Sequence, residues 1–166
     1  CTAASLIAPL RTEPVDESVV SSLTPSLSWT YTDSSCDPDG FDLHLAMGPL
    51  YPTELGGVQV GNPWAPVTPL QPGKVYEWWV SAKSGSSLGP MSGRGFFFTG
   101  PECSVSELTA PVLYLPGDGT IFNPITDIVK WDSVGGCLPD GYRQQYANDA
   151  AFTQIVVNQD STMPWN

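Results

Sequence analysis

The stretch that decides the fold reads LQPGKVYEWWVSA and spans residues 70–82. From Tyr76 to Ala82, apolar residues occupy every second position, and a glutamate and a serine lie among the residues between them. This period of two is typical of a β-strand with one buried face, so Tyr76 and Trp78 are predicted to lie in the core. The Pro-Gly pair just before the strand supplies the backbone angles of a turn.

Two further stretches of the chain alternate in the same way, and clusters rich in Pro and Gly separate them. They are residues 26–30, which include Trp29, and residues 41–46, and a last strand is expected with Phe96 and Phe98 on its inner face. The 166 residues contain 16 Gly and 17 Pro, a composition that favours turns over helices. The sequence therefore predicts an all-β protein of the β-sandwich type, with Trp29 in its core.

The composition excludes several classes of function. Six Lys and Arg against seventeen Asp and Glu give a formal net charge of −11. Since the basic residues are also scattered, nucleic acid is not expected as a partner. No apolar run approaches the roughly 18 residues that cross a bilayer. The sequence also lacks the motifs of nucleophilic, phosphate-binding and metalloprotease sites, so neither catalysis nor a cofactor is expected.

The chain repeats itself after about one hundred residues, which indicates a duplicated domain. Trp29 matches Trp131 at an offset of 102, and Cys36 matches Cys137 at an offset of 101. Similar residues surround both pairs, including a Pro-Asp-Gly turn after each cysteine. Trp131 is therefore predicted to be the core residue of a second copy.

The repeat also sets the predicted domain boundaries. They are a tether at residues 1–7, a first domain at 8–103, a linker at 104–109 and the front half of a second domain at 110–166. The second copy stops before the counterpart of residues 66–103. We therefore expect the second domain to be incomplete at its C-terminal end and the natural chain to continue.

The first copy resembles a fibronectin type III domain, which is an immunoglobulin-like β-sandwich. The resemblance depends on Trp29 in the second strand, residues 70–76 leading to a tyrosine corner, the strand at 78–82 and the last strand at 92–100. It covers the first copy and the front half of the second. It implies two tandem sandwich domains but little about function, because this fold serves many unrelated functions.

The cysteines indicate disulfides rather than a zinc site, because they are far apart and the chain has one histidine. In the overlay of the two copies, Cys36 follows the second strand and Cys103 lies just beyond the last strand of the same domain. We therefore expect a Cys36–Cys103 disulfide. Cys137 is the counterpart of Cys36, and its partner would lie beyond the chain end, so Cys137 is expected to be unpaired.

The first five residues, CTAAS, resemble the start of a mature bacterial lipoprotein. That resemblance implies a lipid on Cys1 and, through it, attachment to a membrane. The alternative is that the sequence simply begins at this cysteine. With the lipid, the protein is expected to be exported and anchored at the cell envelope, facing the periplasm or the exterior.

Two aromatic residues form the candidate interaction surface. By alternation, Trp79 faces away from the core, and Phe97 is expected to face outward beside it, giving an exposed apolar patch. Such a patch fits a protein partner or a sugar ring. The alternative is that a loop, another domain or a stacked side chain covers Trp79.

The other polar residues are predicted to have structural roles. Asp33, Asp37 and Asp39 could offer oxygens to calcium, but the second copy replaces Asp37 with Leu138, so a turn is expected instead of a metal site. His44 is expected on the outer face of its strand as an ordinary surface residue.

These observations favour a non-catalytic envelope protein that acts as a structural or protein-interaction subunit, with a protein partner in a surface assembly. Two alternatives stay open. One is a glycan-binding or spacer module of a larger secreted enzyme, with a glycan as ligand. The other is an extracellular protein that forms or coats filaments.

Overall fold

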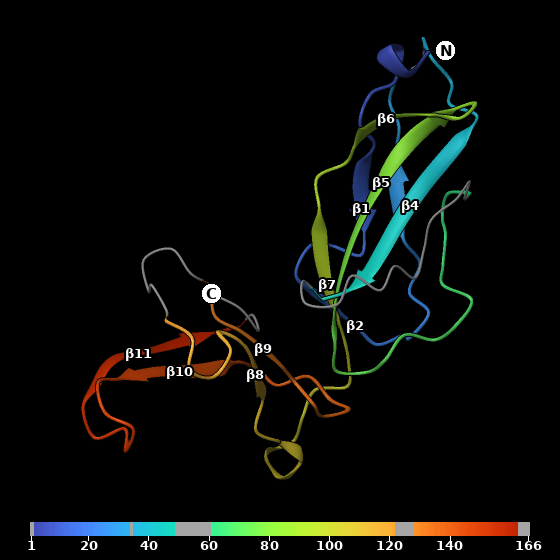
Figure 1. Ribbon diagram of the computed structural model, residues 1–166. Helices are drawn as coiled ribbons and strands as arrows, with labels where there is room; N and C mark the ends of the chain where they lie inside the picture. The colour runs from blue at the N-terminus through green and yellow to red at the C-terminus, as the bar shows by residue number, and fades with distance from the viewer. Residues whose placement is uncertain (1, 34, 49–60, 122–127, 163–166) are drawn as a thin grey trace. The chain divides into compact units, whose positions relative to one another are not determined.

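A computed structural model describes residues 2–33, 35–48, 61–121 and 128–162 of the chain (Figure 1). These residues form eleven strands and two short 3₁₀ helices, and no α-helix occurs among them. The prediction of an all-β protein is therefore confirmed. The chain divides into two compact units, Cys1–Pro101 and Glu102–Asn166, which we call unit 1 and unit 2.

Unit 1 contains a five-stranded sheet and a two-stranded sheet. The larger sheet has the order β2 (Ser18–Val20), β7 (Gly95–Thr99), β5 (Val75–Ser84) and β4 (Gly40–Met47), and β6 (Ser87–Met91) also pairs with β5. The smaller sheet consists of β1 (Leu10–Glu13) and β3 (Ser28–Thr30). The 3₁₀ helix η1 (Ala3–Ser5) precedes β1. All pairs are antiparallel except β2 with β7.

One hydrophobic core joins the two sheets of unit 1. Trp78 and Val80 on β5 are fully buried, and Trp29 on β3 is 2% exposed. They pack in one cluster with Leu43 and Leu45 of β4. Because side chains alternate between the faces of a strand, each sheet turns its apolar face to the other, as in a β-sandwich.

A hydrogen bond fixes the start of β5. The backbone N–H of Gln71 donates to the Tyr76 hydroxyl at 2.8 Å, and Gly73 between them has a φ of 69°, which favours glycine. The Tyr76 ring is 1% exposed. Burial raises the pKa of this phenol, and the bond from Gln71 partly opposes that shift. The turn and the buried ring together hold the chain as it enters the sheet.

Arg11 crosses from the smaller sheet to the start of β7. Its Nε donates to the Gly93 carbonyl at 2.7 Å and its Nη2 to the Arg94 carbonyl at 3.0 Å. The guanidinium lies over the Trp78 ring, 5.4 Å from the ring centre. A Cβ on Gly95 would overlap the guanidinium, so only glycine leaves room for it.

The substitution Gly95→Ala is therefore expected to lower the free energy of unfolding of unit 1 by about 1–3 kcal/mol, because it displaces a partly buried cation from two hydrogen bonds and an aromatic face. Denaturant unfolding followed by tryptophan fluorescence measures the change. Gly93→Ala is the matched control, because a Cβ there meets no atom within 4 Å. Equal stabilities of the two variants would contradict the role given to Arg11.

Unit 2 contains two separate pairs of strands. They are β8 (Val112–Leu115) with β9 (Lys130–Asp132), and β10 (Tyr142–Ala147) with β11 (Ile155–Ser161). Both pairs are antiparallel, and the 3₁₀ helix η2 (Val105–Glu107) precedes them. In the turn between β10 and β11, the Asp149 carboxylate accepts bonds from Thr153 and Gln154, which lower its pKa.

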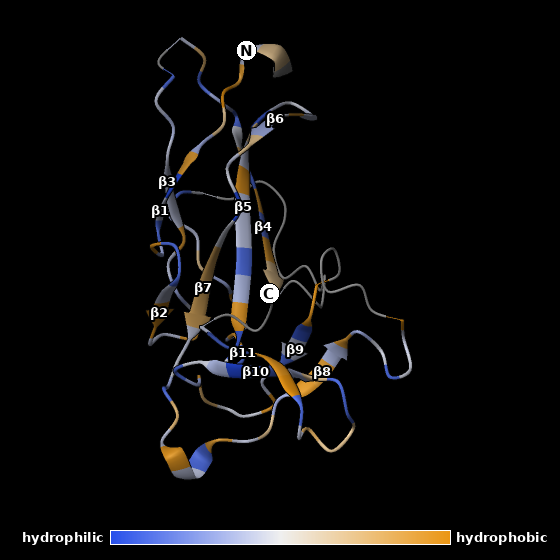
Figure 2. Cartoon of the chain, turned by 90° about the vertical axis from the view of Figure 1, so that its left-hand side faces the viewer, coloured by the Kyte–Doolittle hydropathy of each residue, from blue (hydrophilic) through white to orange (hydrophobic). Residues whose placement is uncertain are grey.

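The core of unit 2 is small and open on one side. Trp131 is 5% exposed and Leu138 9%, but every residue of β8 is exposed. Figure 2 shows that β8 is largely hydrophobic. An exposed apolar strand beside a buried tryptophan indicates a surface that can accept another element.

Candidate functional site

The predicted apolar patch of Trp79 with Phe97 is wrong, because Phe97 lies in the core. Phe97 is fully buried and pairs with Tyr76 across β7 and β5. Their rings stack with centroids 5.6 Å apart. Three consecutive phenylalanines carry no alternation, so the pairing with β5 decides which of them faces inward. Phe96 instead lies on the outer face beside Glu77.

Trp79 lies on the outer face of the larger sheet and is partly buried. The His44 ring from β4 stacks on it, with centroids 4.9 Å apart and an angle of 8° between the planes. The Arg94 guanidinium also lies over the ring, 4.6 Å from its centre. Since β5 lies between β4 and β7, these neighbours reach the indole from its two sides, His44 from β4 and Arg94 from the residue just before β7.

The two side chains that lie against Trp79, His44 and Arg94, each contact a carboxylate. The His44 Nε2 lies 3.1 Å from an Asp42 oxygen, and an Arg94 nitrogen lies 3.2 Å from a Glu77 oxygen. The result is a row of polar side chains, two of them carboxylates, with the indole at its middle. A sugar ring needs an open aromatic face for stacking, and this arrangement covers the indole with side chains instead.

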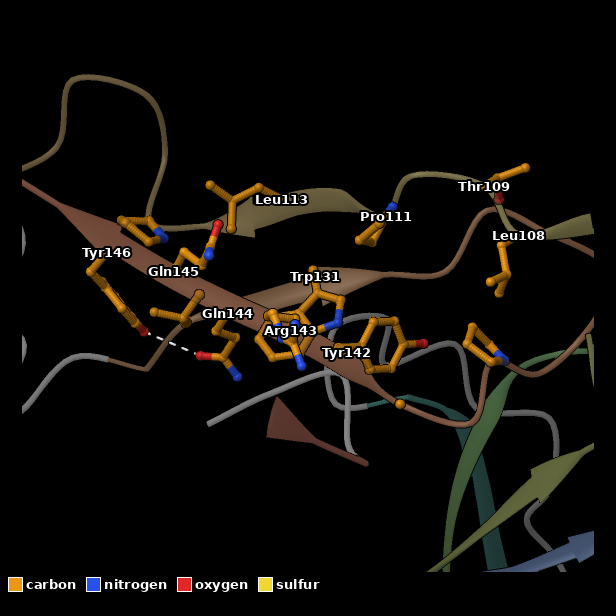
Figure 3. A pocket seen from close by; sticks show the side chains of 14 residues that line it. Leu108, Thr109, Pro111, Leu113, Trp131, Tyr142, Arg143, Gln144, Gln145 and Tyr146 are labelled. Carbon is orange, nitrogen blue, oxygen red and sulfur yellow. Dashed lines mark hydrogen bonds between the residues drawn. The ribbon is translucent and has the colours of Figure 1, made fainter. Parts of the chain in front are cut away.

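A different feature stands out in unit 2, a groove of about 510 Å³ between its two pairs of strands. Figure 3 shows the side chains that surround it. Its apolar and aromatic lining comes from Leu108, Pro111, Leu113, Pro116, Val129, Trp131, Pro139, Tyr142 and Tyr146. Its polar lining comes from Thr109, Arg143, Gln144 and Gln145.

Consecutive residues of β10 line the groove, and their side chains alternate between a buried and an exposed face of the strand. Gln144 is 8% exposed, whereas Arg143 next to it is exposed and pairs with Asp160 of β11 at 2.9 Å. That ion pair lowers the pKa of Asp160. Tyr142 packs edge-on against Trp131, with ring centroids 5.3 Å apart. The inner face of β10 and the indole therefore form the floor of the groove.

The polar atoms at this floor can form hydrogen bonds with a ligand. The Gln144 Oε1 accepts a bond from the Tyr146 hydroxyl at 3.3 Å, but its Nε2 is buried with no hydrogen-bond partner among the described residues. Burial raises the pKa of both Tyr142 and Tyr146, so the phenols stay protonated. The residues that line the groove, all of them described, include no carboxylate, histidine or thiol. The groove therefore offers apolar contact and hydrogen bonds, which is the chemistry of binding.

The predicted disulfide pairing is wrong. Cys103 is bonded to Cys137, so Cys103 does not pair with Cys36 and Cys137 is not unpaired. Cys36 is itself disulfide-bonded. Cys103 lies in unit 2, where its backbone N–H donates to the Leu138 carbonyl at 2.9 Å. This contact brings the start of unit 2 beside the turn before β10, which the overlay of the repeat did not reveal.

The acidic residues near Cys36 have structural contacts. Asp33 accepts bonds from the N–H and hydroxyl of Ser35, which lower its pKa. Asp39 accepts a bond from the Gly85 N–H at 2.6 Å. Within the described parts of the chain, no group of three or more His, Cys, Asp or Glu residues could hold a metal ion.

Comparison with known proteins adds no assignment: no protein-family model matches this chain, and no curated protein matches it. Cys1, the predicted site of lipidation, lies outside the described residues. In the described part, no helix has the length and apolar character that a membrane crossing requires.

The groove was not predicted from the sequence, although the repeat carries a signal for it. The offset of 101 places Gln144 opposite Leu43 and Tyr146 opposite Leu45. Leu43 and Leu45 are fully buried in unit 1. Gln144 and Tyr146 carry polar atoms where unit 1 has buried leucines. This difference indicates that the inner face of β10 has other surroundings than the inner face of β4.

Proposed function

We propose that this chain is a non-catalytic interaction module of an exported protein, built from two tandem immunoglobulin-like domains of the fibronectin type III kind. The groove of unit 2 is its binding surface, and another protein is its partner. The single observation that carries the proposal is this groove, in which apolar side chains surround a buried amide nitrogen with no partner among the described residues.

Strand register supports the tandem repeat. In unit 1, Arg11 pairs with Trp29, and the register shifts before Glu13. In unit 2, Leu113 pairs with Trp131, and the register shifts before Leu115. An offset of 102 residues relates the residues of unit 1 to their counterparts in unit 2, so the register shift occurs at the same place in both copies.

Aromatic packing supports it as well. The Trp29 and Phe41 rings meet edge-on at 5.1 Å and 67°, and their counterparts Trp131 and Tyr142 meet at 5.3 Å and 67°. The hydrogen bond of Tyr76 supports the fibronectin-type identity, because a tyrosine corner is typical of this fold.

Export is supported by the Cys103–Cys137 bond, since structural disulfides persist in oxidising compartments. The lipid anchor on Cys1 stays a prediction. A lipid joined through the Cys1 sulfur would exclude that sulfur from any disulfide. Peptide mapping of the natural protein, which identifies the disulfide partner of Cys36 and the mass of residues 1–5, therefore tests the anchor.

The other two functions have weaker support. The glycan-binding alternative relied on Trp79 as a platform, and His44 and Arg94 lie against that ring. Filament formation stays a prediction that sedimentation at rising protein concentration would test. A protein partner accounts better for an apolar strand that is exposed along its whole length.

Site-specific photo-cross-linking tests the binding surface. A photoreactive phenylalanine replaces Leu113, which lines the groove, or Val112, the adjacent residue that does not. Both side chains are more than half exposed, so neither replacement should disturb folding. In cells that make the protein, position 113 is expected to give one discrete adduct whose partner is identified by mass spectrometry and rebinds when purified. No adduct at position 113, or the same adducts at both positions, would contradict the proposal.

A further inference from the structure

We propose that Cys36 of unit 1 is bonded to Cys1, so that a disulfide closes the start of the chain onto the first domain. The inference goes beyond the proposed function and does not depend on the groove of unit 2. It assigns to Cys1 a modification that competes with the predicted lipid, because a thioether-linked lipid and a disulfide both use the same sulfur atom.

The first support is the inventory of cysteines. The chain contains four cysteines, and no cysteine among the described residues is free. Cys103 and Cys137 are bonded to each other, and Cys36 is also disulfide-bonded. The structure describes a single chain, so the partner of Cys36 lies within these 166 residues. Cys1 is the one cysteine left to form that bond.

The second support is the position of the residue that follows Cys1. The Ser5 hydroxyl lies 3.4 Å from the Cys36 sulfur. The backbone N–H of Thr2 donates to that same hydroxyl at 2.9 Å, and the Thr2 nitrogen is the atom that joins it to Cys1. The α-carbons of a disulfide are usually roughly 4.4–6.8 Å apart. Two short contacts therefore bring the residue next to Cys1 to the Cys36 sulfur, within the reach of a disulfide.

The 3₁₀ helix η1 holds this geometry. The Ser5 N–H donates to the Thr2 carbonyl at 2.9 Å, and the Ser5 hydroxyl donates to the same carbonyl at 2.8 Å. Both bonds close one tight turn, which keeps Thr2 and Ser5 together. Since Ser5 contacts the sulfur of Cys36, the turn keeps Thr2 beside this sulfur as well.

The residues after the turn pack against unit 1. Leu6 is 4% exposed and lies in a hydrophobic cluster with Cys36 and Ala82. On β6, a Cβ on Gly89 would lie 2.6 Å from the Leu6 Cβ, so this glycine makes room for the leucine. The Ile7 N–H also donates to a tyrosine hydroxyl of unit 1 at 3.3 Å. The docked segment supplies the proximity that a disulfide needs, without movement of the backbone.

The bond requires an oxidant from outside the chain. Two S–H bonds break and one S–S bond forms between Cys1 and Cys36. The two protons and two electrons pass to an external disulfide, which is reduced to two thiols. Disulfides of this kind are available in the oxidising compartments where structural disulfides persist, in agreement with the export proposed from the Cys103–Cys137 bond.

Peptide mapping of the natural protein without reduction tests the pairing. Trypsin cleaves after Arg11 and Lys74, so the peptide that ends at Arg11 should be joined to peptide 12–74 and should separate from it on reduction. A separate peptide ending at Arg11, whether lipidated or not, overturns the inference, and so does a link from 12–74 to any other peptide. The cross-link expected at position 113 is unaffected by either result, so the proposed function is tested separately.

Serine variants of the full chain give a second readout. Thiol titration of the denatured, unreduced chain should find no free thiol, and Cys1→Ser should release one, that of Cys36. Amide exchange at Leu6 and Ile7 should then rise at least about tenfold, because the start of the chain is no longer closed onto unit 1. Cys103→Ser is the matched control, because it also frees one thiol but should leave this exchange unchanged. A free thiol in the unsubstituted chain, or equal exchange in the two variants, overturns the inference.

Discussion

Replacing Phe97 with alanine is expected to lower the free energy of unfolding of unit 1 by about 3–5 kcal/mol, the usual cost of removing a buried phenylalanine ring. Phe97 is fully buried and stacks on Tyr76, which itself forms the hydrogen bond that starts β5. The cavity left by the missing ring would therefore lie at the centre of the core of unit 1. Denaturant unfolding followed by tryptophan fluorescence or amide exchange in β5 measures the loss.

Phe96→Ala is the matched control for this experiment. Phe96 has the same side chain on the same strand but is only partly buried on the outer face, so its loss should cost about 1 kcal/mol. The sequence-based expectation was the opposite, with Phe97 outside. A larger effect at Phe96 than at Phe97 would restore that expectation and contradict the observed register.

Removing the Cys103–Cys137 bond by double substitution to serine is expected to destabilise unit 2 by about 2–4 kcal/mol. The two cysteines are 34 residues apart, and closing a loop of that length restricts the unfolded chain by about 4 kcal/mol in the chain-entropy model. Because the core of unit 2 is small, this is a large part of its stability. Amide exchange in β10 should rise strongly, while exchange in β5 of unit 1 should not change.

Peptide mapping checks the pairing itself. Trypsin cleaves after Arg94, Lys130 and Arg143, so without reduction the peptide 95–130 should remain joined to 131–143. A link between 12–74 and 95–130 would instead show the Cys36–Cys103 pairing and contradict the structure. Under that pairing the double substitution would also raise exchange in unit 1, so the two measurements check each other.

Much of unit 1 was predictable because local alternation carries the information. Tyr76 and Trp78 repeat with a period of two, and only one face of such a strand can be buried. Phe97 was not predictable in this way, because residues 96–98 are all phenylalanine. Its orientation follows from the pairing of Tyr76 with Phe97 across two strands, which local sequence does not encode.

The prediction of the disulfide pairing was wrong for a related reason. The overlay of the repeat related Cys137 to Cys36, but a disulfide needs two cysteines close in space, not at equivalent positions. Cys103 lies beside Leu138 through a backbone hydrogen bond between distant segments. Position in the repeat therefore predicted the place of Cys137 but not its partner.

By itself the sequence determined that the chain is all-β and which residues start and fill its strands, because turn chemistry and a two-residue apolar period are local properties. Only the tertiary structure decided that His44 and Arg94 cover Trp79, that Phe97 is buried, and that a groove opens at Gln144. The physical reason is common to all three. Burial and exposure depend on which strands lie side by side, and that pairing is set by contacts between residues far apart in the chain.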